Sequence, residues 1–322
     1  MKLSPASVLA GFLLAAGWLA PAAGAQETAS GAPGQSGTAN ESYSREGADT
    51  CIKCHDSPDI LALFKTKHGS RAAAHSPFAA GQLQCEACHG PGGAHAARVR
   101  SGQPRPPIPN FGASSVASVA TQNQACLGCH ATDVQHDWRD AAHDRNDVAC
   151  SDCHRVHATF DAVRSTRQQA EVCFDCHQQQ RADHMKAFRH PIDGNLMSCS
   201  SCHSPHGSAA EFALRRNSVN ETCYTCHAEK RGPYLWEHAP VTEDCSNCHA
   251  PHGSSQPALL RVRAPLLCQQ CHSQAGHPTF AYGPDNLPGG SQPSSYLAAG
   301  SCLNCHSQVH GSNHPSGSKL TR

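Results

Sequence analysis

The chain has 322 residues, with 25 acidic and 25 basic side chains and only 5% aromatic residues. Its balanced charge gives no electrostatic reason for binding nucleic acid or an anionic membrane surface. Large apolar side chains are sparse, because alanine and cysteine supply much of the apolar fraction. Such a chain cannot bury enough side-chain surface to offset the entropy that folding removes. The composition therefore predicts a core built largely from something other than side chains.

The first 25 residues are typical of a secretory signal peptide. Lys2 is followed by the apolar run Val8 to Leu19 and by Ala23-Gly24-Ala25, which matches a cleavage site. The apolar run is too short to cross a bilayer comfortably, and no cysteine follows the cleavage site to carry a lipid. Residues 26–50 are rich in Gly, Ser, Ala and Thr, and are predicted to form a flexible leader.

From residue 51 onward the pattern Cys-x-x-Cys-His occurs ten times and uses all twenty cysteines. This is the attachment signature of c-type haem: both cysteines form thioethers with the porphyrin, and the histidine ligates the iron. Zinc ribbons and disulfide frameworks also use paired cysteines, but neither needs a histidine after every pair. The sequence therefore predicts ten covalently bound haem c groups, which would supply the core. The predicted thioether cysteines are Cys51, Cys54, Cys85, Cys88, Cys126, Cys129, Cys150, Cys153, Cys173, Cys176, Cys199, Cys202, Cys223, Cys226, Cys245, Cys248, Cys268, Cys271, Cys302 and Cys305.

The motifs fall into five repeats, each with one histidine between its two motifs and another after the second. Ten of the fourteen histidines outside the motifs hold these positions, the number that bis-histidine ligation of ten irons requires. Methionine is the other possible axial ligand, and it would raise the reduction potential. Because methionine is scarce after the signal peptide, most sites are predicted to be bis-histidine sites with low reduction potentials. The predicted proximal ligands are His55, His89, His130, His154, His177, His203, His227, His249, His272 and His306. The predicted distal ligands are His68, His95, His143, His157, His190, His206, His238, His252, His277 and His310.

The spacing of the intervening histidines supports this assignment. In three repeats the intervening histidine follows the motif histidine by thirteen residues, and in a fourth by eleven. His277 departs from the rule, because it follows His272 by only five residues. His75 is the alternative to His68, although it lies off the spacing. Sequence does not say which distal histidine serves which iron. The other histidines without a predicted role are His136, His184 and His314.

The predicted fold is mainly irregular, with short α-helices, little or no β-structure and an elongated shape built on stacked haems. Ser57 and Pro58 predict the start of a helix. That helix would place Leu61, Phe64 and His68 on one face.

Proline also marks a predicted helix end and two predicted connections. Pro191 predicts the end of a helix that contains Phe188. Residues 101–124 contain no predicted ligand and are expected to lie extended over the surface, as a plain connection rather than as a docking surface, which is the alternative. Residues 281–300 are expected to form a second long loop, between the last two motifs.

Several stretches resemble the MtrA/DmsE/MtoA/PioA family of periplasmic decahaem cytochromes, over about residues 50–315. They are the Cys51-Ile-Lys-Cys-His-Asp start, Phe64-Lys-Thr-Lys-His-Gly, the second motif with its Gly-Pro-Gly-Gly-Ala-His extension, and the Cys-x-x-Cys-His-x-Pro-His-Gly units at 199 and 245. Members of this family are similar to two fused pentahaem modules. The resemblance implies an N-terminal half at 51–190 and a C-terminal half at 191–322.

The resemblance implies an electron-transfer conduit rather than an enzyme. Such a conduit, located in the periplasm and associated with the outer membrane, relays electrons to or from the cell exterior for metal reduction or Fe(II) oxidation. The implied partners are a porin-like outer-membrane β-barrel, inner-membrane or periplasmic cytochromes, and an extracellular multihaem cytochrome. A soluble periplasmic shuttle that donates electrons to a reductase is one alternative. A nitrite or hydroxylamine enzyme is another, but it would need an iron with an open position, and the sequence has no Cys-x-x-Cys-Lys variant.

Overall fold

A computed structural model of the chain describes residues 42–132, 136–272, 302–304, 306–315 and 317–321. The signal peptide, most of the leader, the 281–300 loop, Cys305 and His277 lie outside the described residues. Residues Glu41–Arg322 form one compact unit, separate from Met1–Asn40. All of the described residues belong to this unit, and the division into halves at residue 190 remains a prediction.

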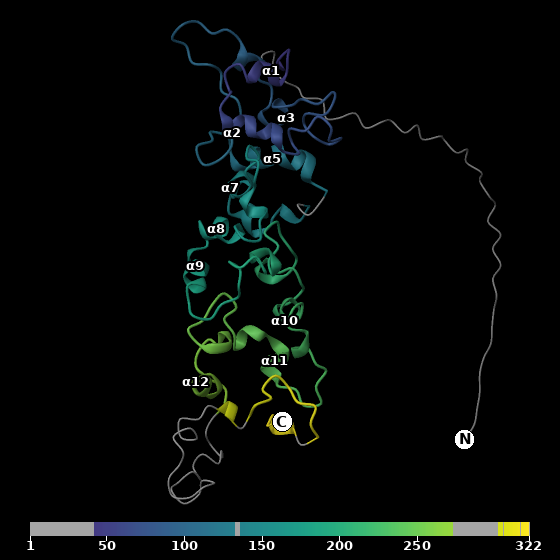
Figure 1. Ribbon diagram of the computed structural model, residues 1–322, viewed down its shortest axis with the longest axis vertical. Helices are drawn as coiled ribbons and strands as arrows, with labels where there is room; N and C mark the ends of the chain where they lie inside the picture. The colour runs from purple at the N-terminus through teal and green to yellow at the C-terminus, as the bar shows by residue number, and fades with distance from the viewer. Residues whose placement is uncertain (1–41, 133–135, 273–301, 305, 316, 322) are drawn as a thin grey trace, which may run out of the picture. The chain divides into compact units, whose positions relative to one another are not determined.

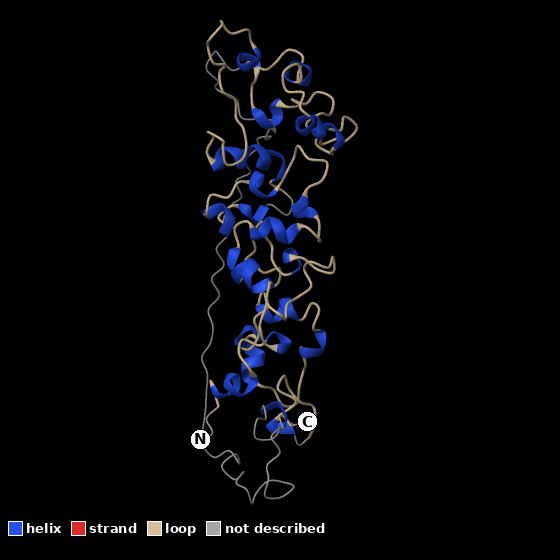
Figure 2. Ribbon diagram, turned by 60° about the vertical axis from the view of Figure 1, so that its left-hand side comes forward, coloured by secondary structure: helices blue, strands red, loops and turns tan. Residues whose placement is uncertain are grey.

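Short helices joined by irregular loops make up this unit (Figures 1 and 2). The longest described helix is α5, which begins where the Ser118 hydroxyl accepts a hydrogen bond from the Thr121 amide at 3.2 Å. The α-helices are α1 Ala48–Cys51, α2 Pro58–Leu61, α3 Glu86–His89, α4 Gly93–Ala96, α5 Val119–His130, α6 Ala142–Arg145, α7 Cys150–Cys153, α8 Gln169–Phe174, α9 Gln178–His184, α10 Val219–Cys223, α11 Ala239–Glu243 and α12 Ala264–Gln269. The 3-10 helices are η1 Ala62–Lys65, η2 His136–Trp138, η3 Ala162–Arg164, η4 Cys199–Ser201, η5 Glu211–Ala213, η6 Ala228–Lys230, η7 Cys245–Asn247, η8 Pro257–Leu259, η10 Cys302–Asn304 and η11 Gly317–Lys319.

Extended pairing in the described chain is limited to isolated β-bridges. These bridges join Phe188 to Ser254, His203 to Leu214, Trp236 to Ser312 and His249 to Leu260. The prediction of a mainly irregular fold with short helices and little β-structure is therefore confirmed. None of the described helices is long and apolar enough to span a membrane.

The helix predicted around Phe64 is shorter than expected. It begins at Pro58 with Ser57 at the N-cap position, as predicted, but α2 ends at Leu61 and η1 at Lys65. The prediction that His68 shares a helical face with Phe64 is therefore wrong. The Phe64 ring instead packs edge-on against Phe78, with ring centroids 5.3 Å apart.

The helix end predicted at Pro191 is also wrong. Helix α9 ends at His184, before Phe188. The backbone of Phe188 pairs with Ser254 through two hydrogen bonds of 3.0 and 2.8 Å. This pairing replaces a helix and carries the chain toward His190 in an extended form.

Side-chain burial is sparse throughout the described chain. Leu63 and Phe78 form a small buried cluster with Ala48, and no large side chain among the described residues is fully buried. Met185 and Phe212 remain 72% and 69% exposed. The side chains therefore do not build the core that a globular domain of this length would have, as the composition predicts.

Buried carboxamides join successive motif-bearing elements. Asn123, on α5, accepts a hydrogen bond from the Cys150 amide at 2.8 Å, and Asn220, on α10, accepts one from the Cys245 amide at 2.7 Å. Both asparagines are buried, and each also donates to a backbone carbonyl just before the cysteine that it holds. Each bond fixes the start of one motif against the preceding motif. Gln84 and Gln169 accept comparable bonds from the Ala48 and Ser200 amides, at 2.6 and 2.8 Å.

Candidate functional site

The first cysteines of neighbouring motifs lie side by side. In five pairs, the thiols are close enough to hydrogen-bond and to shift each other's pKa. Burial, for example, is the largest cause that raises the pKa of Cys85 to about 12, and the Cys51 thiol adds to it. The described cysteines form no disulfide. The five pairs are Cys51/Cys85, Cys126/Cys150, Cys173/Cys199, Cys223/Cys245 and Cys268/Cys302.

The second cysteine of the second, fourth, sixth and eighth motifs faces the motif that follows. Its pKa is raised first by burial and further by a thiol of the next motif. The cysteine pairs that show this effect are Cys88 with Cys126, Cys153 with Cys176, Cys202 with Cys223, and Cys248 with Cys271. Contacts through first and second cysteines therefore alternate, and the ten motifs meet one another in chain order.

Nine of the predicted proximal histidines each lie opposite one predicted distal histidine. The ring centroids within these pairs are 5.9 to 6.4 Å apart. A metal–imidazole bond is about 2 Å long, so two nitrogens on opposite sides of one iron are about 4 Å apart. The rest of the centroid separation is the distance from each coordinating nitrogen to the centroid of its own imidazole ring. The nine pairs are His55/His95, His68/His130, His89/His157, His143/His177, His154/His206, His190/His227, His203/His252, His238/His272 and His249/His310.

Burial keeps several of the predicted distal rings neutral. It is the largest cause that lowers the pKa of these imidazoles, and the facing motif histidine lowers it further. Only a neutral imidazole can bind a metal ion, so the surroundings favour the form that iron requires. The five predicted distal histidines with a lowered pKa are His68, His157, His206, His252 and His310.

The Pro-His-Gly sequence that follows the sixth and eighth motifs has a structural reason. The carbonyl oxygen of Pro251 lies 2.8 Å from Nδ1 of His190, so that ring nitrogen donates to it and Nε2 is left for a metal. His252 comes next, and Gly253 follows it. This residue is glycine because its φ is +154° and because a Cβ there would collide with the Asp183 carbonyl oxygen. Pro205, His206 and Gly207 repeat the arrangement, with the His143 Nδ1 at 2.8 Å from the Pro205 oxygen.

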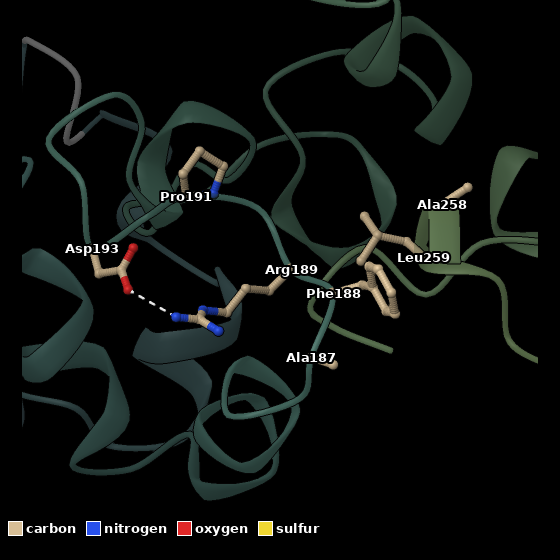
Figure 3. Close-up of a pocket in the computed structure, with 7 residues that line it drawn as sticks. All are labelled: Ala187, Phe188, Arg189, Pro191, Asp193, Ala258 and Leu259. Atoms are coloured by element: carbon tan, nitrogen blue, oxygen red, sulfur yellow. Dashed lines mark hydrogen bonds and ion pairs between the residues drawn. The ribbon is translucent and has the colours of Figure 1, made fainter. Parts of the chain in front are cut away.

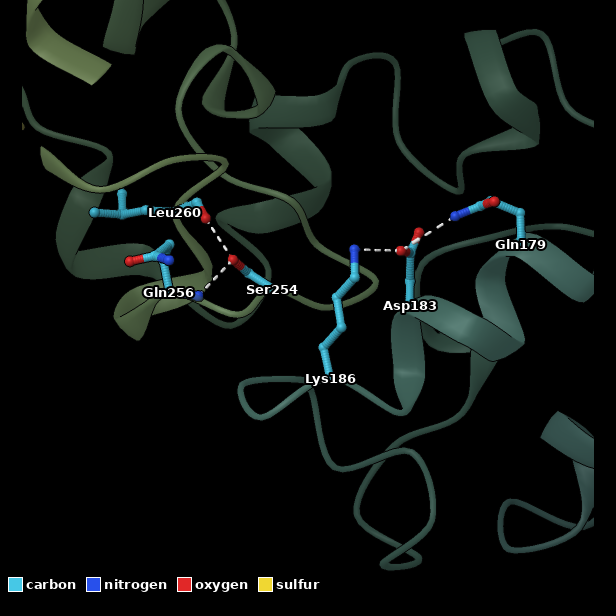
Figure 4. A network of polar contacts seen from close by, with 6 residues as sticks. All are labelled: Gln179, Asp183, Lys186, Ser254, Gln256 and Leu260. Atoms are coloured by element: carbon cyan, nitrogen blue, oxygen red, sulfur yellow. Dashed lines mark hydrogen bonds and ion pairs between the residues drawn. The ribbon is translucent and has the colours of Figure 1, made fainter. Parts of the chain in front are cut away.

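The same region holds the end of α9 beside the 254–260 loop (Figure 4). Asp183 accepts hydrogen bonds from Lys186 at 2.6 Å and Gln179 at 3.3 Å. The Ser254 hydroxyl donates to the Leu260 carbonyl oxygen and accepts from the Gln256 amide at 2.9 Å. These contacts fix both walls of the close approach at Gly253.

The proline-rich stretch at 101–124 does more than connect two motifs. The carbonyl oxygens of Pro106 and Pro109 each lie 2.8 Å from Nδ1 of a candidate ligand, His95 and His89 respectively. The prediction of an extended plain connection is therefore wrong in two respects, since α5 also begins within it, at Val119. Proline suits this role because it presents a carbonyl oxygen from a restrained backbone.

Two further features fit a large, partly acidic, apolar group. Trp138 is buried, and its indole nitrogen has no hydrogen-bond partner among the described residues. Its ring lies 6.3 Å from His143 and 6.2 Å from His206, so a haem propionate between these segments would supply an acceptor.

An open cavity of about 430 Å³ is lined by residues before and after His190 and by residues of η8. Phe188 and Leu259 give it one apolar wall, and the Arg189–Asp193 ion pair of 3.3 Å lies at another side (Figure 3). Ala258, which lines it, also offers its carbonyl oxygen to His249 Nδ1 at 2.8 Å. An apolar wall beside two candidate ligands and a guanidinium fits a porphyrin with acidic substituents.

Two of the histidines without a predicted role, His75 and His184, lie apart from these pairs. His75 is exposed, and no ring contact involving it occurs among the described residues. His184 is buried against Phe174, with ring centroids 5.8 Å apart, and its Nε2 lies 3.7 Å from an Asp193 oxygen. His306 is described, whereas the predicted distal ligand His277 lies outside the described residues.

Comparison with known proteins agrees with this arrangement. Residues 190–232 and 238–277 match the doubled CXXCH motif family, and residues 85–169 match the NrfB-like cytochrome c-type family. The cytochrome c-type protein NrfB of Haemophilus influenzae is 28% identical over 153 residues, which cover 42% of this chain and 67% of the relative. The multiheme cytochrome MtrA of Shewanella baltica is 51% identical over 286 residues, which cover 88% of this chain and 84% of the relative.

Identity at this level across most of both chains, together with ten haem-attachment motifs, confirms the resemblance and the prediction of covalently bound haem c. The chain belongs to the MtrA family of multihaem c-type cytochromes, whose work is electron transfer.

Proposed function

We propose that the chain is an electron conduit in which ten bis-histidine haems form a file that follows the order of the motifs. The observation that carries this proposal is the set of nine facing histidine pairs, each joining a motif histidine to a histidine from another repeat or motif. The haem c groups supply reversible one-electron transfer. The chain's own part is to attach each group through two cysteines, supply two facing imidazoles for its iron, and keep successive motifs in contact.

A simple rule assigns the ligands. An intervening histidine serves the motif two places later in the chain, as His190 serves the motif of His227. A trailing histidine serves the motif two places earlier, as His252 serves that of His203. Away from the two ends, each site therefore takes its two histidines from two successive repeats, which links every repeat to the next one.

The rule changes only at the two ends. At the N-terminal end no earlier repeat exists, and His95 faces His55 of its own repeat. At the other end, the rule offers no motif two places after the ninth, and we assign His277 to the tenth motif, that of His306. Substitution His277→Ala is expected to convert only this tenth site to high-spin iron.

This ligation argues against substrate chemistry. A multihaem enzyme needs at least one iron with an open coordination position. In the proposed assignment both axial positions at every site are taken by histidine, so no position is left for nitrite or hydroxylamine.

We place the conduit in the periplasm, associated with the outer membrane. It would lie within a porin-like β-barrel supplied by another polypeptide, and exchange electrons with inner-membrane or periplasmic cytochromes and with an extracellular multihaem cytochrome. The similarity to MtrA and the signal-like N-terminus support this placement. Extracellular metal reduction and Fe(II) oxidation are the two processes that such a conduit would serve.

Reconstitution tests the conduit directly. The holoprotein and the porin-like β-barrel proposed as its partner are placed in liposomes that enclose a reduced viologen dye, and ferric citrate is added outside. Dye oxidation that needs both proteins is expected, and leakage controls use liposomes with the barrel alone. Dye oxidation no faster with both proteins than with the barrel alone would overturn the proposal.

A soluble periplasmic shuttle is the second candidate, favoured by the match of residues 85–169 to NrfB-like cytochromes. Small-angle scattering on the holoprotein separates the two. Removal of the predicted signal peptide leaves about 297 residues, and a globular chain of that length has a radius of gyration of about 19 Å. A file of ten haems long enough to pass a hydrocarbon layer of about 30 Å must have a larger radius of gyration. A radius near the globular value would favour the shuttle.

A further inference from the structure

The candidate axial histidines differ in what their Nδ1 atoms contact. In the described chain, eight of these atoms lie 2.6 to 2.9 Å from a neutral backbone carbonyl oxygen: those of His89, His95, His143, His190, His203, His238, His249 and His306. Among the candidate ligands that the structure describes, one makes this contact to a carboxylate. Nδ1 of His154 lies 2.8 Å from an oxygen of Asp161. The His227 ring and Glu229 are 3.8 Å apart, which is too long for a hydrogen bond.

The acceptor stands at a different place in the segment that follows each of these motifs. In the sixth motif the carbonyl that holds Nδ1 of His203 belongs to Phe212, nine residues on, and the eighth motif uses Ala258 in the same way for His249. Asp161, seven residues after His154, reaches back with its side chain instead of its backbone.

The Asp161 carboxylate is held firmly in this position. Its second oxygen accepts a hydrogen bond from the Arg155 amide at 3.3 Å, and its side chain is 19% exposed. Among the described residues its ion-pair partner is His154, and no lysine or arginine neutralises it.

We propose that Asp161 sets the reduction potential of the fourth haem site, making it lower than those of the sites at His203 and His249. This inference rests on the proposed role of His154 as an iron ligand. An imidazole that donates its N–H to a carboxylate is a more basic ligand than one that donates to a carbonyl. A more electron-rich ligand favours ferric over ferrous iron. The site accepts one electron from its donor, while the proton stays on Nδ1.

The test is a redox titration of the holoprotein followed by its visible absorbance. Asp161→Asn keeps a hydrogen-bond acceptor but removes the charge. About one tenth of the absorbance change, one site of ten, is expected to move to a more positive potential while the rest superimposes on wild type. Asp161→Ser is a second neutral variant, expected to move the same tenth, and gives the measurement if the Asn variant incorporates fewer haems.

Asp152→Asn is the matched control. It makes the same change of charge within the same motif, but Asp152 is exposed and binds the Ala149 amide at 2.8 Å rather than an imidazole. Its titration is expected to match wild type. The proposal is overturned if the Asp161 variants also match wild type, or if Asp152→Asn shifts the curve equally.

Low-temperature magnetic resonance of the same samples separates this failure from that of the ligand assignment. Low-spin iron at all sites with unmoved potentials would defeat the role of Asp161 alone. High-spin iron in the wild-type protein at the His154 site would defeat the assignment itself.

Discussion

The rings of His249 and His310 lie 6.1 Å apart and within 11° of parallel, although 61 residues separate them in the chain. The other eight pairs also join distant segments, the longest link being His89 with His157. Each of these candidate sites therefore has both of its histidines only when two segments far apart in the chain lie side by side. Haem ligation in this protein also acts as a long-range constraint on the fold, because each site holds two separated segments together.

Substitution of His68 tests the pairing at the third motif. His68→Ala removes the ring that lies 6.0 Å from His130, so one haem is expected to become high-spin and to bind carbon monoxide when reduced. The control is His75→Ala, since His75 is exposed and off the spacing. Spectra that change for His75→Ala and not for His68→Ala would show that the thirteen-residue spacing assigns the wrong histidine.

Gly253 tests the close approach that seats His252. In Gly253→Ala the new methyl group would collide with the Asp183 carbonyl oxygen, at a φ of +154°. Backbone must shift, so we expect a loss of more than about 1 kcal/mol of unfolding free energy and high-spin iron at the site of His203. Haem content, urea midpoint and spin state report these effects.

The matched control for that variant lies inside a motif. Gly128→Ala, on α5, adds a methyl group that meets no atom of the described chain within 4 Å, and alanine favours helix. Its urea midpoint is expected to equal or slightly exceed that of wild type. Equal losses in both variants would contradict the steric explanation.

Asn220→Ala tests the carboxamide that joins the seventh and eighth motifs. The substitution leaves the Cys245 amide without its acceptor at 2.7 Å and removes the bond to the Val241 carbonyl. Stranded buried backbone groups cost about 1–3 kcal/mol, which urea unfolding of the holoprotein measures. Asn247→Ala is the control: Asn247 is exposed and makes one bond of 3.2 Å, so a change within about 0.5 kcal/mol is expected. Equal effects would remove the special role of Asn220.

Acid is expected to weaken the structure. Burial, followed by the charge of the facing ring, lowers the pKa of His206 and His252 below the ordinary 6.5. Between these two values the unfolded chain binds more protons than the folded one. The stability contributed by these rings is therefore complete above pH 6.5 and is lost as the pH falls through the lowered pKa. Iron binding acts in the same direction, because iron binds only the neutral ring.

A series of urea midpoints between about pH 8 and pH 5 checks this sign. We expect a plateau above the ordinary histidine pKa and a falling midpoint below it, accompanied by loss of low-spin absorbance. A midpoint that rises on acidification would contradict the role of these buried rings.

The sequence alone identifies the residues that the structure brings together, but not how they pair. Periodicity selects His68 because the distance from a motif to its following histidine is local and regular. The partner of that histidine, His130, is set by how repeats stack, and no local spacing encodes it. The sequence pattern does not predict the role of Asn123 and Asn220, because a single polar residue before a cysteine is common. Both nevertheless stand three residues before the first cysteine of a motif.

Low-temperature magnetic resonance of the fully oxidised holoprotein tests the central claim most directly. With ten haems confirmed by mass, the account predicts low-spin, bis-histidine ferric signals that integrate to ten irons per chain and no carbon monoxide binding after reduction. A substantial high-spin signal, or carbon monoxide binding at several reduced irons, would contradict the closed file of histidine-ligated haems and favour an enzyme.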